Sequence, residues 1–252
     1  MHFSFFRKNK HIFILLFFVT LAYIPILSGM VSLTNDARMV TYPVFYYFSD
    51  QLSKGHIPWW HYNINLGFPL HADPGTPFWN PIFWLFVLIG KNYYVFTLFI
   101  WIHVPIASIG VFKLCRWLKI SANASTIVAF TYVCSGYYAN HLQHPNNLLE
   151  AAYLPYVLLY FFKILNSTDF LNALYLSVSF FFLINSGYPA FPVSMLYFLS
   201  IILLVAITTD AQLRINQSLK RIFFLLGISL LFTVILCLPY LISLAGIFNN
   251  FY

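Results

Sequence analysis

Three polar segments of this otherwise apolar sequence carry side chains that could move protons or bind a charged ligand. The first contains Asp36, which directly follows the first apolar run, in the segment 34–38. A carboxylate at the boundary of an apolar phase is partly desolvated, and this suits it to proton abstraction. Asp36 is therefore our first candidate for a catalytic base. The alternative interpretation is a loop aspartate that caps a helix.

The second segment, 67–74, places His71 two residues before Asp73. In an extended backbone the side chains of residues i and i+2 lie on the same face, so this pair could bind a cation or hold a phosphate-bearing ligand. Two ligands are too few to predict a metal site, and we assign no metal ligands, although a divalent metal could take part. A rigid loop rich in proline and glycine, with polar side chains on it, is the alternative.

The third segment joins His141 and His144 to Glu150, at the start of an apolar run at 148–165. An acidic side chain that faces lipid is costly, so Glu150 should face a polar partner or a wet cavity. Its position near a helix N-terminus, where the helix dipole favours negative charge, is the alternative explanation.

The elements that must position these segments are hydrophobic helices. Hydrophobic residues make up 61% of the 252 residues and charged residues 8%, and the mean hydropathy is +0.78. A soluble domain carries about a quarter charged residues. Because so few charges cannot solvate a globular surface, the solvent must be lipid. A helix needs about 20 apolar residues to cross a bilayer. That length predicts an all-α bundle of seven membrane-spanning helices at 12–31, 93–115, 122–140, 148–165, 170–187, 189–208 and 222–247.

The distribution of lysine and arginine predicts the orientation. A shorter apolar run, 78–90, contains Pro81 and is ambiguous. If it does not cross, ten basic residues lie on the cytoplasmic side and three, Arg38, Lys54 and Lys91, on the outer side. If it crosses, the split becomes four inside against nine outside, which the positive-inside rule disfavours. We therefore predict a multi-pass protein of the cell membrane with a cytoplasmic N-terminus, in which 78–90 is a re-entrant or interfacial segment.

This arrangement makes 1–252 a single transmembrane domain with a large first extracytoplasmic loop at 32–92. In that loop Pro43 can occupy the first turn of a short amphipathic helix and Gly55 can end it. The helix would lie in the membrane interface. Its apolar stripe would consist of Val44, Phe45, Phe48 and Leu52.

Several common signatures are absent from the sequence. It contains no P-loop, Rossmann glycine pattern, GxSxG or HExxH, which excludes ATP-driven transport and the commonest hydrolases within this chain. The basic residues form small clusters between apolar runs, which is typical of topology signals, so we expect no nucleic-acid partner. The three cysteines have no metal-binding spacing, and we expect no disulfide. Because no small-x-small cleavage site follows the first apolar run, we prefer an uncleaved span to a signal peptide.

The polar segments also carry an ordered pattern of glycine, proline and tryptophan. It runs Asp36…Tyr42-Pro43…Lys54-Gly55-His56-Ile57-Pro58-Trp59-Trp60…Gly67-Phe68-Pro69…Ala72-Asp73-Pro74…Trp79-Asn80-Pro81, then Ser135-Gly136-Tyr137…His144-Pro145-Asn146…Glu150, then Cys237-Leu238-Pro239. In order and spacing this resembles the YfhO family of bacterial membrane proteins, which belong with the GT-C type glycosyltransferases. The resemblance covers essentially all of this chain but only the N-terminal part of a family member.

The resemblance implies a transferase that passes a sugar from a polyprenyl-phosphate donor to a cell-envelope acceptor on the extracytoplasmic face. It matches the catalytic acidic residue of the first outer loop to Asp36. Positive charge for the departing lipid phosphate would come from Arg38, Lys54 or a histidine. The further candidates for substrate binding are His71, Asp73, His144 and Glu150. Because family members are longer, we expect a truncated chain, or a partner subunit that supplies the missing spans.

Two other functions stay open at this point. A transporter or flippase of lipid-linked intermediates would usually show charges at the membrane midplane and an internal repeat, and neither is visible here. A non-catalytic remnant or assembly subunit agrees with the short length.

Overall fold

The computed structural model describes residues 2–64, 67–167, 169–208 and 219–251, and within them the chain is almost wholly helical. The elements are α1 (His2–Ala22), α2 (Ile24–Leu27), the π-helical turn η1 (Ala37–Thr41), α3 (Tyr42–Ser53), β1 (Trp60–His61), β2 (Phe68–Pro69), α4 (Pro81–Ile89), α5 (Tyr93–Trp117), α6 (Ala122–Val133), α7 (Gly136–His141), α8 (Pro145–Asn166), α9 (Phe170–Ile184), α10 (Ala190–Thr208) and α11 (Leu219–Phe251). The two short strands pair antiparallel, with Trp60 opposite Pro69.

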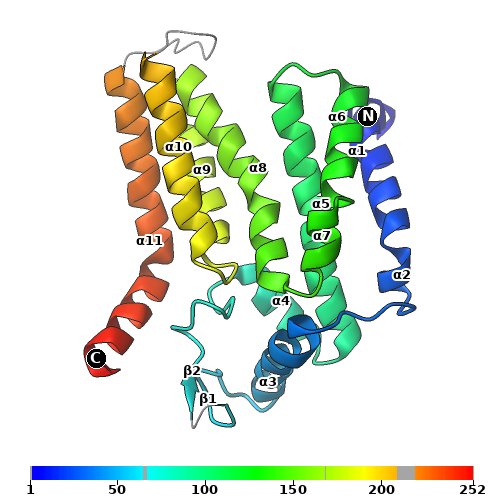
Figure 1. Ribbon diagram of the computed structural model, residues 1–252, viewed down its shortest axis with the longest axis vertical. Helices are drawn as coiled ribbons and strands as arrows, with labels where there is room; N and C mark the ends of the chain where they lie inside the picture. Colours follow the sequence, from blue (N-terminus) through cyan, green and yellow to red (C-terminus); the bar gives the residue numbers. More distant parts are fainter. Residues whose placement is uncertain (1, 65–66, 168, 209–218, 252) are drawn as a thin grey trace.

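The long helices run along the long dimension of the molecule (Figure 1). α5 and α8 form the centre, because they pack on each other while α5 also packs on α6 and α8 on α9. α1 covers α5 and α6, and α11 packs on α9. Burial decreases from the central helices outward. In the most apolar 18-residue stretch of each helix, 72% is buried in α5, against 22% in α10 and 28% in α11. The last two helices therefore present most of their apolar side chains outward, as helices in lipid do.

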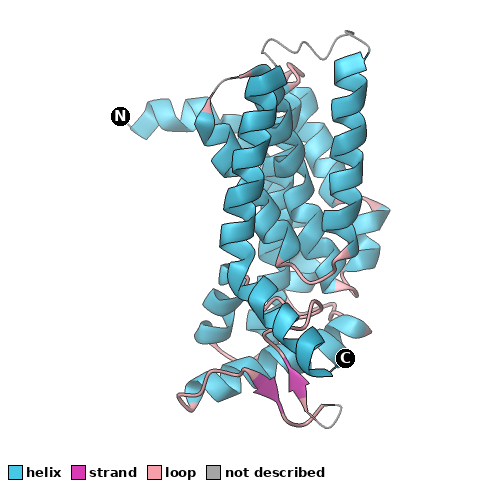
Figure 2. Cartoon of the chain, turned by 90° about the vertical axis from the view of Figure 1, so that its left-hand side faces the viewer, coloured by secondary structure: helices cyan, strands magenta, loops and turns pink. Residues whose placement is uncertain are grey.

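The connections between these helices lie at two ends of the bundle. The loop end carries residues 28–92, 134–144 and 185–189, and the N-terminal end carries the start of α1 and the 118–121 connection (Figure 1). Figure 2 shows the strand pair at the loop end, remote from the N-terminus. All three polar segments singled out in the sequence therefore emerge at the loop end.

Four helices of the described residues are long and apolar enough to cross a membrane, which supports a membrane protein. They are Tyr93–Trp117, Pro145–Asn166, Ala190–Thr208 and Leu219–Ile247. Two further apolar helices, Asn9–Ala22 and Phe170–Ile184, are shorter. The sequence predicted seven spans, and within the described residues the structure supports an all-helical chain in which these four helices could cross a membrane.

Two of the predicted spans are interrupted. The run 12–31 breaks at Tyr23, because Pro25 brings no N–H to the helix and its ring disfavours a continuous turn. The run 122–140 breaks after Val133, where the hydroxyl of Ser135 donates to the carbonyl of Tyr132 at 2.8 Å and a new helix, α7, begins at Gly136. Each predicted span is therefore built from two consecutive helical pieces.

The first large loop folds against the loop end of the bundle. Its helix α3 has Pro43 in the first turn, and Gly55, with a φ of 79°, follows its end. Phe45 and Phe48 of the apolar stripe are fully buried against rings from α4 and α5, such as Phe83. The stripe thus packs on protein, whereas the sequence had suggested the membrane interface.

The ambiguous run 78–90 forms α4, whose nine residues span about 14 Å and are too short to cross a bilayer. The side-chain oxygen of Asn80 caps its start by accepting the N–H of Ile82 at 2.9 Å. α4 packs on α3 and α5, so protein covers one of its faces.

Candidate functional site

Asp36 and His144 meet at the loop end, although 108 residues separate them in sequence. Nδ1 of His144 lies 2.8 Å from Oδ2 of Asp36. The side chains are 59% exposed for Asp36 and 40% exposed for His144, so the pair is open to a ligand that approaches from the surface. Both had been singled out from the sequence, but nothing in the sequence predicted that they pair.

Hydrogen bonds between neighbouring residues hold the two segments together. The N–H of Ala37 donates to the carbonyl of Gln143 at 2.9 Å. The side-chain amide of Asn35 also donates to Oε1 of Gln143. Asn35 itself has a φ of 49°, a left-handed conformation that asparagine tolerates better than most residues. The chain therefore turns sharply just before Asp36, and this turn directs the carboxylate toward His144.

The contact between Asp36 and His144 would allow the two side chains to move a proton together. In the neutral imidazole tautomer that carries its proton on Nδ1, His144 donates to the carboxylate of Asp36 and keeps the lone pair of Nε2 to accept a proton. Within the part of the chain that the structure describes, Nε2 of His144 has no hydrogen-bond partner. A carboxylate that orients a histidine and stabilises its protonated form is the arrangement of a general base and its positioning partner.

A pocket of about 300 Å³ adjoins this pair. Its walls come from residues 31–34, which end two positions before Asp36, and from Ala139, Asn140, Leu142 and Gln143, the last of which precedes His144. The pair itself lies next to these walls in sequence and does not line the pocket. Small-molecule sites commonly begin at this volume. The pair thus stands at the edge of a space that could receive the reacting part of a ligand.

Asn146, in the first turn of α8, connects two further loops to the same helix end. Its side-chain amide donates to the carbonyl of Gly75 at 2.9 Å and to the carbonyl of Gly187 at 3.3 Å. The first contact holds the turn that follows Asp73, and the second holds the α9–α10 connection. The first turns of α8 therefore join three segments of the loop end, and Asp36 belongs to one of them.

Glu150 lies next along α8 and is fully buried. Its Oε1 accepts the backbone N–H of Tyr188 at 2.5 Å, while its Oε2 has no partner among the described residues. The sequence predicted that this carboxyl would face a polar partner away from lipid, and the structure supplies Tyr188 as that partner. Because Glu150 is buried, its contact with Tyr188 holds the α9–α10 connection against α8 and does not present the carboxyl to the surface.

His71 and Asp73 do not act as a pair. The backbone at His71 is a turn, whereas the sequence argument assumed an extended segment. Nδ1 of His71 contacts the carbonyl oxygen of Trp59 at 3.0 Å. Asp73 accepts the N–H of Gly75 at 3.0 Å and the hydroxyl of Thr76 at 2.6 Å. Both side chains therefore shape the loop, and this corrects the expectation of a shared ligand-binding face.

The basic candidates differ in their surroundings. Arg38 is exposed on η1, two residues after Asp36. Nζ of Lys54 instead contacts Asp50 at 2.6 Å, and Nζ of Lys91 contacts the other oxygen of Asp50 at 2.7 Å. Hydrogen bonds from Lys54 and Lys91 hold the pKa of Asp50 below its usual value. Since Asp50 offsets one of the two lysine charges, Arg38 is better placed than Lys54 to meet an anion near Asp36.

Metal binding has little support at this site. Among the residues that the structure describes, no group of three or more histidine, cysteine, aspartate or glutamate side chains is arranged to hold a metal ion. Asp36 and His144 together offer two ligands, and structural or catalytic zinc sites use at least three from the protein.

Sequence reasoning missed several contributors to this site. Gln143 and Asn146 hold the loops, and Lys91 shares Asp50 with Lys54. Asparagine near the start of an apolar helix is a common signal, but it indicates a helix boundary and not a partner elsewhere in the chain.

Comparison of the chain with protein-family models, curated proteins and solved structures finds no match in any of the three.

Proposed function

We propose that this protein is a membrane glycosyltransferase of GT-C type. It would transfer a sugar from a polyprenyl-phosphate donor to a cell-envelope acceptor at the extracytoplasmic face. The observation that supports this most directly is the contact of 2.8 Å between Asp36 and His144, near a pocket at the loop end of the bundle. A donor with a lipid tail stays in the bilayer, so a site for it must open at the membrane surface.

The proposal includes a membrane topology. α1 and the shorter α9 run beside the other long helices, and α6 continues into α7 after its break (Figure 1). With these helices counted as crossing, the chain has seven spans. Of the described basic residues, those outside the first large loop lie toward the N-terminal end, which the positive-inside rule assigns to the cytoplasm. The loop end, with Asp36 and His144, is then extracytoplasmic.

In the transfer step the acceptor hydroxyl oxygen forms a bond to the anomeric carbon of the sugar. The bond between that carbon and the phosphate oxygen breaks, and the lipid phosphate leaves with the bonding electrons. Nε2 of His144 takes the acceptor proton, and the carboxylate of Asp36 stabilises the imidazolium that results. The guanidinium of Arg38 compensates the charge that develops on the departing phosphate. From the sequence the base was expected to be Asp36 alone, whereas the proposed mechanism divides this role between the two residues.

A transfer assay tests the proposal. Membranes that contain the wild type or Asp36→Asn would receive labelled polyprenyl-phosphate sugars, and the incorporated label would be measured at equal amounts of membrane protein. We expect Asp36→Asn to lower transfer by about 10²- to 10⁴-fold, the usual contribution of general base catalysis. Asp169→Asn is the matched control, because this substitution lies at the N-terminal end and asparagine also caps helices well. Undiminished transfer by Asp36→Asn would remove the pair from the mechanism.

The outward faces of α10 and α11 favour an assembly role as the second candidate. With 22% and 28% of their most apolar windows buried, these helices have room for a partner subunit beside the surrounding lipid. A chain with this role would co-purify stoichiometrically with another membrane protein and would keep that association in Asp36→Asn, which separates it from the transferase.

A further inference from the structure

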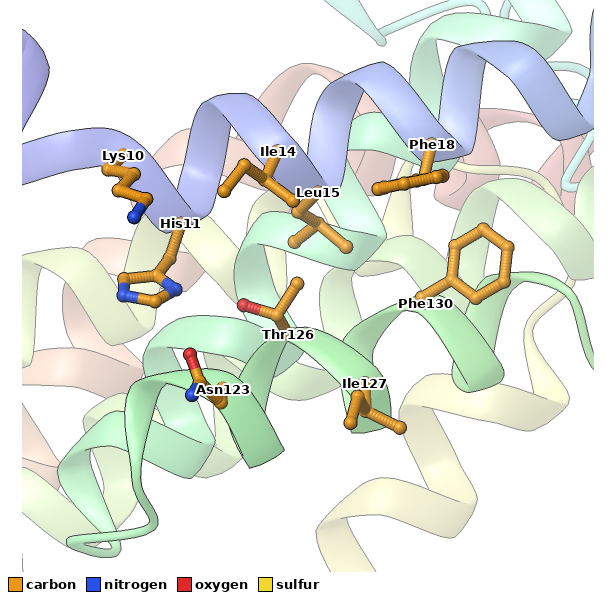
Figure 3. Close-up of a pocket in the computed structure, with 9 residues that line it drawn as sticks. All are labelled: Lys10, His11, Ile14, Leu15, Phe18, Asn123, Thr126, Ile127 and Phe130. Atoms are coloured by element: carbon orange, nitrogen blue, oxygen red, sulfur yellow. The ribbon is translucent and has the colours of Figure 1, made fainter.

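A second groove lies between α1 and α6, at the N-terminal end and remote from Asp36. Figure 3 shows its side chains, and its volume is about 420 Å³. α1 and α6 pack on each other, so the groove follows the seam between two helices of the bundle. Neither the polar segments at the loop end nor the proposed transfer reaction uses it.

The groove is polar at one end and apolar at the other. Lys10, His11 and Asn123 gather at one end in Figure 3, and Phe18 and Phe130 close the other. The two phenylalanine rings meet edge to face with their centroids 6.4 Å apart. Between these ends the lining consists of Ile14, Leu15, Thr126 and Ile127. From Lys10 to Phe18 the helix rises about 12 Å, which is enough to follow part of a hydrocarbon chain.

The direction of this gradient agrees with the position of a membrane surface. In the sequence the apolar run of α1 begins directly after Lys10, so Lys10 stands at its boundary and the residues from Ile14 onward lie deeper. The hydroxyl of Thr126, in the middle of the groove, donates to the carbonyl of Ala122 at 2.9 Å. This hydroxyl therefore needs no acceptor from a ligand. The polar mouth therefore faces the headgroup region and the apolar part faces the acyl region.

Lys10 lines the mouth, and further basic side chains lie in the connection that leads into α6. Lys10 is exposed, and the 118–121 connection beside the start of α6 carries the exposed Lys119. Arg116, also exposed, lies in the last turn of α5, where its guanidinium donates to the carbonyl of Ile120 at 2.5 Å. No acidic side chain lines the groove within the described part of the chain. A ligand at this mouth is therefore favoured if its head carries negative charge.

We propose that this groove binds one anionic phospholipid, with an acyl chain along the seam of α1 and α6 and the phosphate at Lys10 and Asn123. The ammonium group of Lys10 supplies charge, and the side-chain amide of Asn123 supplies hydrogen-bond donors to phosphate oxygens. Basic pockets between membrane helices commonly recognise lipid headgroups in this way. A zwitterionic lipid would fill the apolar part equally well but would bring a cation to a mouth that is already positive.

Native mass spectrometry of the full chain in detergent tests this proposal. Dioleoyl phosphatidylglycerol and dioleoyl phosphatidylcholine, which share their acyl chains, would be titrated separately. We expect tighter binding of phosphatidylglycerol, and a loss of about fivefold in its affinity for Lys10→Gln, since one lysine near an anionic lipid contributes about 1 kcal/mol. Lys163→Gln is the matched control, because it removes the same charge from the N-terminal end but lies outside the groove.

A second variant tests the apolar part. Ile14→Trp should fill the groove and weaken the binding of both lipids, whereas Lys10→Gln should affect phosphatidylglycerol alone. Equal losses in Lys10→Gln and Lys163→Gln would show a diffuse surface charge effect and overturn the proposal. So would equal affinity for the two lipids, or binding of sn-glycerol 3-phosphate as tight as that of phosphatidylglycerol, since the acyl chain would then contribute nothing.

Discussion

A Cβ atom placed on Gly187 would lie 2.8 Å from Cγ of Asn146, closer than such atoms approach in proteins. Gly187 also has a φ of 115°, which side chains larger than hydrogen rarely adopt. This close approach brings the α9–α10 connection to the first turn of α8. We therefore expect Gly187→Ala to lower the free energy of unfolding by about 1–3 kcal/mol, measured by thermal unfolding in detergent.

Gly136→Ala is the control for this prediction. Gly136 begins α7, has no positive φ, and has open space where a Cβ would stand. Alanine is favoured over glycine in helices, so this variant should be neutral or slightly more stable. Equal destabilisation by the two variants would mean that the contact with Asn146 is unimportant.

The Asp36–His144 contact predicts strong coupling between the two residues. If the proposed transferase uses them as one unit, His144→Gln should lose about as much transfer activity as Asp36→Asn, about 10²- to 10⁴-fold. The double variant should then be little worse than the more damaged single variant, because either substitution already disables the unit. A complete mutant cycle of initial transfer rates measures this. Losses that multiply would show two independent contributions.

Two substitutions of Glu150 distinguish the contribution of its hydrogen bond to stability from that of its carboxyl group. Glu150→Gln keeps a carbonyl oxygen that can accept the N–H of Tyr188, so thermal stability should change little. Glu150→Ala leaves that N–H without its partner and should cost about 1–3 kcal/mol. If the glutamine variant were as unstable as the alanine variant, the carboxyl itself and not its hydrogen bond would be required.

The burial of His61 predicts that the stability of the β1–β2 strand pair depends on pH. It is 5% exposed, its ring stacks on Tyr47 with centroids 3.9 Å apart, and its Nδ1 accepts the N–H of Asn63 at 3.3 Å. Burial lowers the pKa of His61 below its ordinary value. Since the folded state favours the neutral ring, the stabilisation is fully present above the unfolded pKa of about 6.5 and is lost as pH falls through the lowered folded pKa.

Hydrogen exchange of the β1 amides, corrected for the intrinsic effect of pH, measures this change. Protection in the wild type should fall as pH decreases from 7 to 5, about the range in which histidine titrates. His61→Phe keeps an aromatic ring against Tyr47 but cannot be protonated, so its protection should vary less with pH. The same pH dependence in both proteins would assign the effect to another group.

The proposed orientation predicts which end of the bundle a reagent reaches. Cys134 is exposed, whereas Cys115 and Cys237 are buried, so Cys134→Ser gives a background with little labelling. In that background Thr34→Cys should react with a membrane-impermeant maleimide on intact cells. Lys119→Cys, at the N-terminal end, should react after permeabilisation. The opposite pattern would reverse the orientation and place Asp36 in the cytosol.

The sequence by itself determined the helical, membrane-spanning character of the chain and the approximate positions of its long helices. Apolar length and charge spacing are local properties, and a helix satisfies its backbone hydrogen bonds locally in lipid. The order of the apolar runs also brought Asp36 and His144 to the same end, because successive helices in a bundle alternate in direction.

Only the tertiary structure decided which side chains meet. Asp36 contacts His144 because the carbonyl of Gln143, which precedes His144, accepts the N–H of Ala37, which follows Asp36. Lys54 contacts Asp50 instead of remaining available for a phosphate. Such contacts depend on how helices far apart in the chain are rotated and shifted against each other, and no local pattern encodes these offsets. The helix breaks at Tyr23 and after Val133 could not be predicted from the sequence either. The length of an apolar run indicates that a segment can cross a membrane, but it does not show where packing divides the helix.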